Sequence, residues 1–95
     1  MTTLQEDFLN YQAKTTPHPL GIEVKKAKGV YITDTSGKKY LDFIAGISVC
    51  SLGHCHSKVV TAIRKQIKKH MHVMVYGEFA QSAAVSLSKE LIALL

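Results

Sequence analysis

The sequence of 95 residues lacks several features that mark specialised classes of protein. No hydrophobic run reaches the roughly 18 residues that a membrane-spanning helix needs, so we expect no membrane partner. The first residues include Glu6 and Asp7 but no cationic stretch, which argues against a secretory signal peptide. Internal repeats and low-complexity tracts are also missing. The expected organisation is therefore one small globular segment over residues 1–95.

Cysteine is scarce as well, since Cys50 and Cys55 are the only two. They are too few and too close together to frame a disulfide-stapled fold, so we expect reduced thiols and a cytoplasmic location. With His54 and His56 they offer sulfur and nitrogen ligands, but zinc sites usually add a second ligand pair further along the chain. A metal site and a Cys–His nucleophile pair are alternatives. We favour histidines that bond backbone groups and fix the loop, with no metal ligand.

Acidic residues are outnumbered, and the net charge is +5 with a sequence pI near 9.3. A basic balance permits nucleic acid or acidic ligands as partners. The cations around Lys65 lie opposite an apolar stripe on a predicted helix, and no aromatic residues alternate with them. This pattern favours a solvated helix face, and a nucleic-acid partner is not expected.

The first half of the chain predicts a helix and a sheet. Thr3 and Glu6 fit a capping box, which begins a helix over about residues 3–14. Alternating apolar and polar residues over about 22–43 predict a short antiparallel meander. Asp34 and Gly37 fit the two ends of a tight turn within it.

The second half predicts helices over about residues 57–72 and 80–95, joined by a connector over residues 73–78. Ser57 can cap the first helix, whose apolar stripe is Val59, Val60, Ile63, Ile67 and Met71. The last helix reaches Leu95 without a glycine, proline or cationic stop signal, as in a sequence that continues. The fold class is therefore α+β: an N-terminal helix, a short antiparallel meander, then two helices.

Residues 46–56 form an apolar stretch without a helix or strand period, bracketed by Gly46 and Gly53. Irregular segments on a rigid scaffold often carry binding residues. A buried crossover loop is the alternative that composition alone favours.

Several motifs follow one another through residues 29–67. An apolar strand ends at Asp34, then come Tyr40-Leu41-Asp42-Phe43, Gly46-Ile47-Ser48 and Leu52-Gly53-His54-Cys55-His56 before a helix. In this order they resemble the N-terminal part of the class-III aminotransferases, the pyridoxal-phosphate-dependent group that includes ornithine, acetylornithine and 4-aminobutyrate transaminases. Ser57 stands where that family usually has proline, and both residues can begin a helix.

The resemblance implies part of the small domain of a fold-type-I enzyme, a homodimer with active sites at the subunit interface. Its reaction moves an amino group from an amino acid or ω-amino acid to a 2-oxo acid. By similarity, Ile47 and Ser48 occupy the turn that faces the substrate. The His54-Cys55-His56 run is then structural.

The resemblance also implies that the lysine, the acid and the phosphate-binding amides that hold pyridoxal phosphate lie beyond residue 95. We therefore expect an N-terminal fragment that binds no cofactor alone, contains no catalytic residue and is inactive by itself. Two alternatives stay open: a stand-alone α+β interaction or oligomerisation module, and a small basic nucleic-acid-binding domain.

Overall fold

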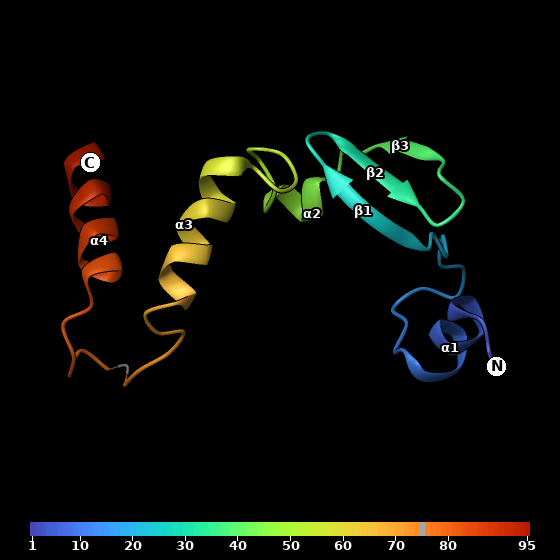
Figure 1. Ribbon diagram of the computed structural model, residues 1–95, viewed down its shortest axis with the longest axis horizontal. Coiled ribbons are helices and arrows are strands. Elements are labelled where there is room, and N and C mark those ends of the chain that lie inside the picture. Colours follow the sequence, from blue (N-terminus) through green and yellow to red (C-terminus); the bar gives the residue numbers. More distant parts are fainter. Residues whose placement is uncertain (75) are drawn as a thin grey trace. The chain divides into compact units, whose positions relative to one another are not determined.

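The computed structural model describes residues 1–74 and 76–95, so Val75 of the predicted connector lies outside the described residues. The chain divides into two compact units, Met1–Val60 and Thr61–Leu95. In chain order the elements are α1 (Leu4–Tyr11), β1 (Val24–Lys28), β2 (Tyr31–Asp34), β3 (Lys39–Leu41), α2 (Ala45–Ser48), α3 (Ser57–Ile67) and α4 (Ser82–Leu94) (Figure 1). Within the described part of the chain, no helix is both long and apolar enough to cross a membrane.

Helix α1 begins as the capping box predicts. The Thr3 side chain accepts a hydrogen bond from the Glu6 amide, and the Glu6 carboxylate accepts one from the Thr3 amide. The helix ends at Tyr11, before the predicted end at residue 14, because the backbone of Gln12 is already extended. Lys14 lies beyond this end, and its Nζ donates to the Leu9 carbonyl at 2.6 Å. A lysine placed there satisfies a terminal carbonyl that has no partner within the helix.

The predicted meander is confirmed as a three-stranded antiparallel sheet in the order β1-β2-β3. Lys28 pairs with Tyr31 across a tight turn at Gly29, whose φ of 59° suits glycine. Tyr31 in turn pairs with Leu41 of β3. The register shifts between Val24 and Lys26, which marks a bulge in β1.

The hairpin between β2 and β3 is organised by a buried carboxylate. Asp34 accepts hydrogen bonds from Ser36 Oγ at 2.6 Å, the Lys38 amide at 2.9 Å and Tyr40 Oη at 3.0 Å. The hydrogen bond from Ser36, with those from Tyr40 and Lys38, holds the pKa of Asp34 below its usual 3.8 although burial opposes this. The Asp34 carboxylate can be buried without a large penalty because its oxygens accept these hydrogen bonds.

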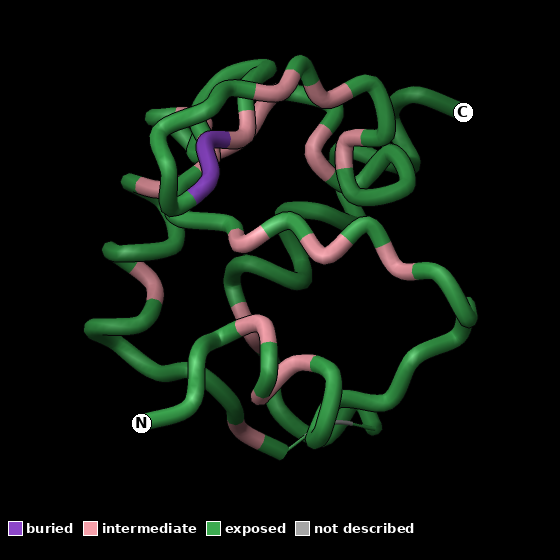
Figure 2. The backbone as a smooth tube through the Cα atoms, turned by 90° about the vertical axis from the view of Figure 1, so that its right-hand side faces the viewer, coloured by how far each residue is buried: buried purple, intermediate pink, exposed green. Residues whose placement is uncertain are grey.

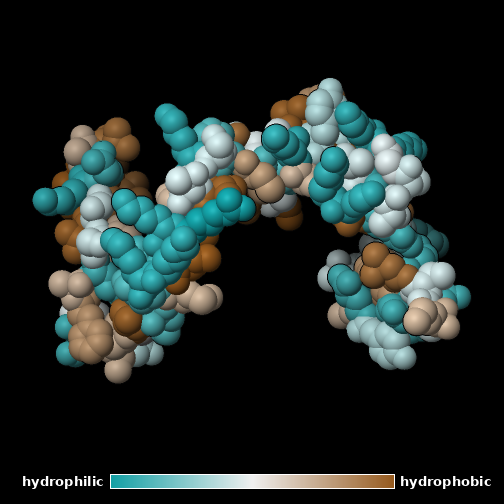
Figure 3. Space-filling view, in the orientation of Figure 1, coloured by the Kyte–Doolittle hydropathy of each residue, from teal (hydrophilic) through white to brown (hydrophobic). Residues whose placement is uncertain are grey.

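The apolar side chains, in contrast, are not buried. Among the described residues no hydrophobic side chain falls in the buried class, and the one short buried stretch contains Thr33 and Asp34 (Figure 2). Leu41 is 51% exposed and Phe43 89%, although alternation places both on the apolar side of the returning strand. Hydrophobic atoms also lie at the surface around α4 (Figure 3). Exposed apolar surface of this extent marks contact sites for another surface.

Helix α3 ends at Ile67 rather than near residue 72. The Gln66 carbonyl accepts from the amides of Lys69 and His70 at 2.9 and 3.1 Å, and Gln66 Nε2 donates to the His70 carbonyl. These bonds close the helix, so Met71 lies outside the helical part of the predicted stripe. Helix α4 begins at Ser82, after Gln81, whose side chain makes no capping bond.

We expect Tyr40→Phe to weaken the β2–β3 hairpin because it removes one donor to the buried Asp34 carboxylate. The loss should be about 1 kcal/mol, which speeds amide exchange in the hairpin about fivefold. Hydrogen exchange followed by NMR measures this. Tyr31→Phe is the matched control, since Tyr31 is exposed on the neighbouring strand. Equal exchange rates in the two variants would contradict the assignment.

Candidate functional site

The candidate site is centred on α2, whose backbone is left-handed. Ala45, Gly46, Ile47 and Ser48 have φ values of 50°, 60°, 58° and 66°. The Ser48 amide donates to the Ile44 carbonyl at 3.2 Å and the Val49 amide to the Ala45 carbonyl, which closes a left-handed helical turn. Each non-glycine residue in this conformation costs about 1–2 kcal/mol. Ile47 is the most unusual of the four because its side chain is β-branched.

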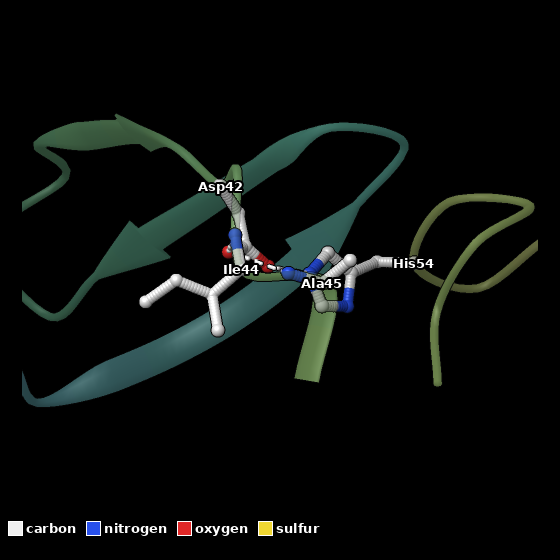
Figure 4. Close-up of polar contacts among 4 residues, drawn as sticks. All are labelled: Asp42, Ile44, Ala45 and His54. Carbon is white, nitrogen blue, oxygen red and sulfur yellow. Dashed lines mark hydrogen bonds and ion pairs between the residues drawn. The ribbon is translucent and has the colours of Figure 1, made fainter. Parts of the chain in front are cut away.

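Asp42 supports this turn from the residue that follows β3. Its Oδ1 accepts from the Ile44 amide at 2.9 Å and the Ala45 amide at 3.1 Å (Figure 4). Its own amide donates to the Val30 carbonyl at 2.8 Å, which ties the residue to the sheet. The turn therefore begins at a carboxylate that the meander holds in place.

The second carboxylate oxygen of Asp42 is bonded to a histidine twelve residues further along the chain. His54 Nε2 lies 2.6 Å from Asp42 Oδ2, and the two side chains are 18% and 7% exposed (Figure 4). The hydrogen bond with His54, followed by those from the Ala45 and Ile44 amides, holds the pKa of Asp42 below its usual 3.8. The carboxylate thus bonds two adjacent backbone amides and the imidazole ring of His54.

The backbone of His54 is bonded to the first hairpin. The Gly29 amide donates to the His54 carbonyl at 2.9 Å, and the His54 amide donates to the Gly29 carbonyl at 2.8 Å. The approach requires glycine at position 53, because a Cβ there would lie 3.2 Å from the Gly29 carbonyl oxygen. The loop over residues 46–56 is therefore closed at its end by a backbone bridge.

Of the residues predicted to face a substrate, Ile47 is 86% exposed and Ser48 is also exposed. Phe43 and Val49, which lie near them in the sequence, are exposed as well. No contact in the structure tests the predicted substrate role, which stays a prediction.

His54 fixes the loop, as predicted. Its ring, however, does not bond a backbone group, which was the predicted partner. The ring bonds the Asp42 carboxylate, and that carboxylate bonds the backbone. His56 does not act this way, since its Nδ1 is buried without a hydrogen-bond partner. Cys50 and Cys55 are free, and over residues 1–74 and 76–95 no cluster of metal-ligating side chains occurs.

Sequence reasoning missed the Asp42–His54 pair. One available signal was Asp42 itself, four positions before the irregular segment over residues 46–56, where an aspartate carboxylate can accept from nearby amides. The histidine partner could not be found from spacing, because twelve residues of non-repetitive chain separate the two.

A groove of about 720 Å³ lies between α1 and the extended segment before β1. Its lining is mainly apolar and includes Phe8, Tyr11, Leu20 and Ile22. The lining also includes the carboxylates of Asp7 and Glu23. None of its non-glycine residues has a positive φ, whereas three residues of the turn over 45–48 do. Backbone strain of that kind concentrates at functional sites, so the turn is the better candidate.

The fit to pyridoxal phosphate can be tested on the lysines. A lysine that captures the cofactor's aldehyde is activated by desolvation or by a neighbouring charge. All eleven lysines of this chain are exposed on the strands, helix surfaces and loops. None of the eleven is desolvated as such a lysine would be, and the expectation that this chain binds no cofactor alone stays a prediction.

Comparisons with known proteins agree on one family. The family model for class-III aminotransferases matches residues 11–95. The acetylornithine aminotransferase of Methanocaldococcus jannaschii is 43% identical over 94 residues, which covers 95% of this chain and 23% of that protein. The acetylornithine aminotransferase of Bacillus amyloliquefaciens is 56% identical over 52 residues, 55% of this chain and 23% of that protein.

Among solved structures, the ω-transaminase of Pseudomonas jessenii in complex with PMP superposes with a TM-score of 0.84 at 20% identity. The match covers 99% of this chain and 22% of that one, and it shows the fold. The segment therefore has the α+β fold of part of a transaminase. The chain is a member of the class-III aminotransferase family, and it spans under a quarter of the length of these relatives.

The lowered pKa of Asp42 gives a pH prediction. The carboxylate supports the turn at pH values above 3.8, and this support is lost as the pH falls through the lowered pKa. We expect the amide shifts of Ile44 and Ala45, followed by NMR, to titrate with a midpoint below 3.8. His54→Ala should move that midpoint upward. A midpoint at or above 3.8 in the unsubstituted protein would exclude the bonding described.

The bridge at Gly29 gives a second prediction with a matched pair of variants. Gly53→Ala combines a φ of 89° with a backbone contact at 3.2 Å, whereas a Cβ at Gly29, with φ of 59°, meets nothing within 4 Å. We expect Gly29→Ala to cost about 1 kcal/mol from φ alone and Gly53→Ala clearly more. Urea unfolding measures the difference. Equal losses of stability in the two variants, or a larger loss in Gly29→Ala, would show that the close approach at Gly53 is unimportant.

Proposed function

We propose that this chain acts as the N-terminal segment of a pyridoxal-phosphate-dependent aminotransferase, which moves an amino group from an amino acid or ω-amino acid to a 2-oxo acid. The observation that carries the proposal is Ile47, a β-branched residue held at φ 58° and ψ 58° on an exposed turn. Backbone strain of this kind persists only where surrounding bonds impose it, and it concentrates at binding sites. Family membership supplies the reaction class.

In this proposal Ile47 and Ser48 bind and orient the amino donor. The Ile47 side chain offers an apolar wall to the donor's carbon chain, and a wall of this kind discriminates length by about 1–3 kcal/mol per methylene. The Ser48 hydroxyl can donate and accept hydrogen bonds to a polar group of the donor. Both residues contact substrate without taking part in proton transfer.

Pyridoxal phosphate, bound by other parts of the enzyme, would accept the amino group from the donor and pass it to the 2-oxo acid. The exposed lysines of residues 1–95 offer no site for its aldehyde. This chain therefore supplies substrate contacts and surface, and by itself it is expected to be inactive.

The expected partners are further parts of the enzyme and a second copy of it, in the cytoplasm. Support comes from the exposed apolar side chains of α4, where Leu87, Leu91 and Leu94 lie on the surface. A stand-alone interaction module is less well supported, because a module that folds alone needs buried apolar area. Among the described residues no hydrophobic side chain is buried.

The proposal is tested with a chimera in which residues 1–95 replace the residues that they match in the Methanocaldococcus jannaschii acetylornithine aminotransferase, where the match covers nearly the whole chain. We expect the purified chimera to bind pyridoxal phosphate and to transfer the amino group of N-acetylornithine to 2-oxoglutarate. Absorbance of the bound cofactor and a coupled assay for glutamate measure this. The host without the replaced segment is the control and should be inactive. A folded chimera that binds cofactor but transfers no amino group would exclude the proposed function.

A further inference from the structure

We propose that Asp42 and His54 are positioning residues for donor recognition: their pair holds the left-handed turn that presents Ile47 and Ser48. The inference rests on the proposed function for the identity of the ligand, but the geometry stands independently of it. Neither residue reaches the exposed face of the turn, because both side chains are largely buried, with 7% and 18% exposure. They act through the backbone that they hold.

The turn needs such support because its conformation is unfavourable for three of its four residues. Ala45, Ile47 and Ser48 all prefer the right-handed or extended regions, and Gly46 alone enters the left-handed region without penalty. Two amides at the start of the turn, those of Ile44 and Ala45, find their acceptor in one oxygen of Asp42. Removing that acceptor leaves both amides unpaired and releases the turn toward a relaxed backbone.

His54 fixes the direction of this acceptor. The carboxylate could rotate about its side-chain bonds, but its Oδ2 is bonded to His54 Nε2, and the His54 backbone is bonded on both sides to Gly29. Asp42 is therefore bonded at the same time to the sheet through its amide, to the turn through Oδ1 and to His54 of the bridge through Oδ2. Even a small shift of the turn would move the Ile47 side chain relative to the bound amino donor.

Asp34 provides a matched control within the same sheet. It is a buried carboxylate that also accepts three hydrogen bonds, but all three come from the β2–β3 hairpin and none from the turn. Its loss should destabilise the protein without moving Ile47. Comparing the two acids separates a positioning role from a general loss of stability.

The experiment uses the chimera described above with three variants. Asp42→Leu should raise KM for N-acetylornithine about tenfold while kcat changes less than about twofold, because the Ile44 and Ala45 amides lose the acceptor that begins the turn. Asp42→Asn keeps an oxygen for the two amides and should restore KM to within about threefold of the parent. Asp34→Asn should leave KM unchanged.

The preference for N-acetylornithine over 4-aminobutyrate is the second kinetic measurement. We expect Asp42→Leu to reduce the ratio of the two kcat/KM values, and Asp34→Asn to preserve it. If Asp42→Leu and Asp34→Asn changed KM and this ratio equally, or if Asp42→Leu lowered kcat alone, the positioning role would be refuted.

Crystal structures of the parent chimera and Asp42→Leu provide a measurement that needs no activity. Residues 45–48 should leave the positive-φ region in the variant, and their retention there would overturn the inference. An inactive parent chimera whose turn nevertheless depends on Asp42 would count against the proposed function while supporting the structural role of the pair.

Discussion

The 2.6 Å hydrogen bond between Asp42 and His54 is the contact on which the arrangement of residues 29–56 depends. It joins the end of the sheet to the end of the loop, and the other carboxylate oxygen begins the turn between them. The bond with His54 fixes the orientation of the carboxylate that accepts from the two amides at the start of the left-handed turn. A buried, hydrogen-bonded carboxylate can impose such a backbone because its acceptors would otherwise be left unsatisfied in a partly desolvated place.

The first unit is thus organised by two carboxylates, Asp34 in the hairpin and Asp42 before the turn, and the described residues bury no hydrophobic side chain. Hydrogen bonds specify geometry well but contribute modest net stability, whereas apolar burial contributes most of the folding free energy. Local geometry and folding stability therefore come from different groups of residues. Polar clusters define the local shape of the first unit, and the apolar side chains, such as Phe43 and the leucines of α4, are exposed.

The local elements were predictable because their signals are local. The capping box at Thr3 and the turn from Asp34 to Gly37 both depend on residues within four positions of each other, and both formed as expected. Helix ends were less predictable. Helices α1 and α3 end at Tyr11 and Ile67, earlier than periodicity indicates. Side-chain hydrogen bonds occur at both ends, from Lys14 to the Leu9 carbonyl and from Gln66 to the His70 carbonyl, and apolar periodicity does not describe them. Alternation over residues 22–43 correctly predicted the meander but does not decide burial, since Leu41 and Phe43 are exposed.

The sequence by itself determined the α+β class, the order of the elements and, through its motifs, the family. It also marked the segment that contains Ile47 and Ser48. The tertiary structure alone decided the partner of His54, the left-handed path of Ala45 to Ser48 and the direction in which Ile47 is presented. The reason is that the carboxylate at the start of the turn is oriented by a residue twelve positions away, and the loop is closed by Gly29 with His54. No periodicity or spacing rule describes such contacts.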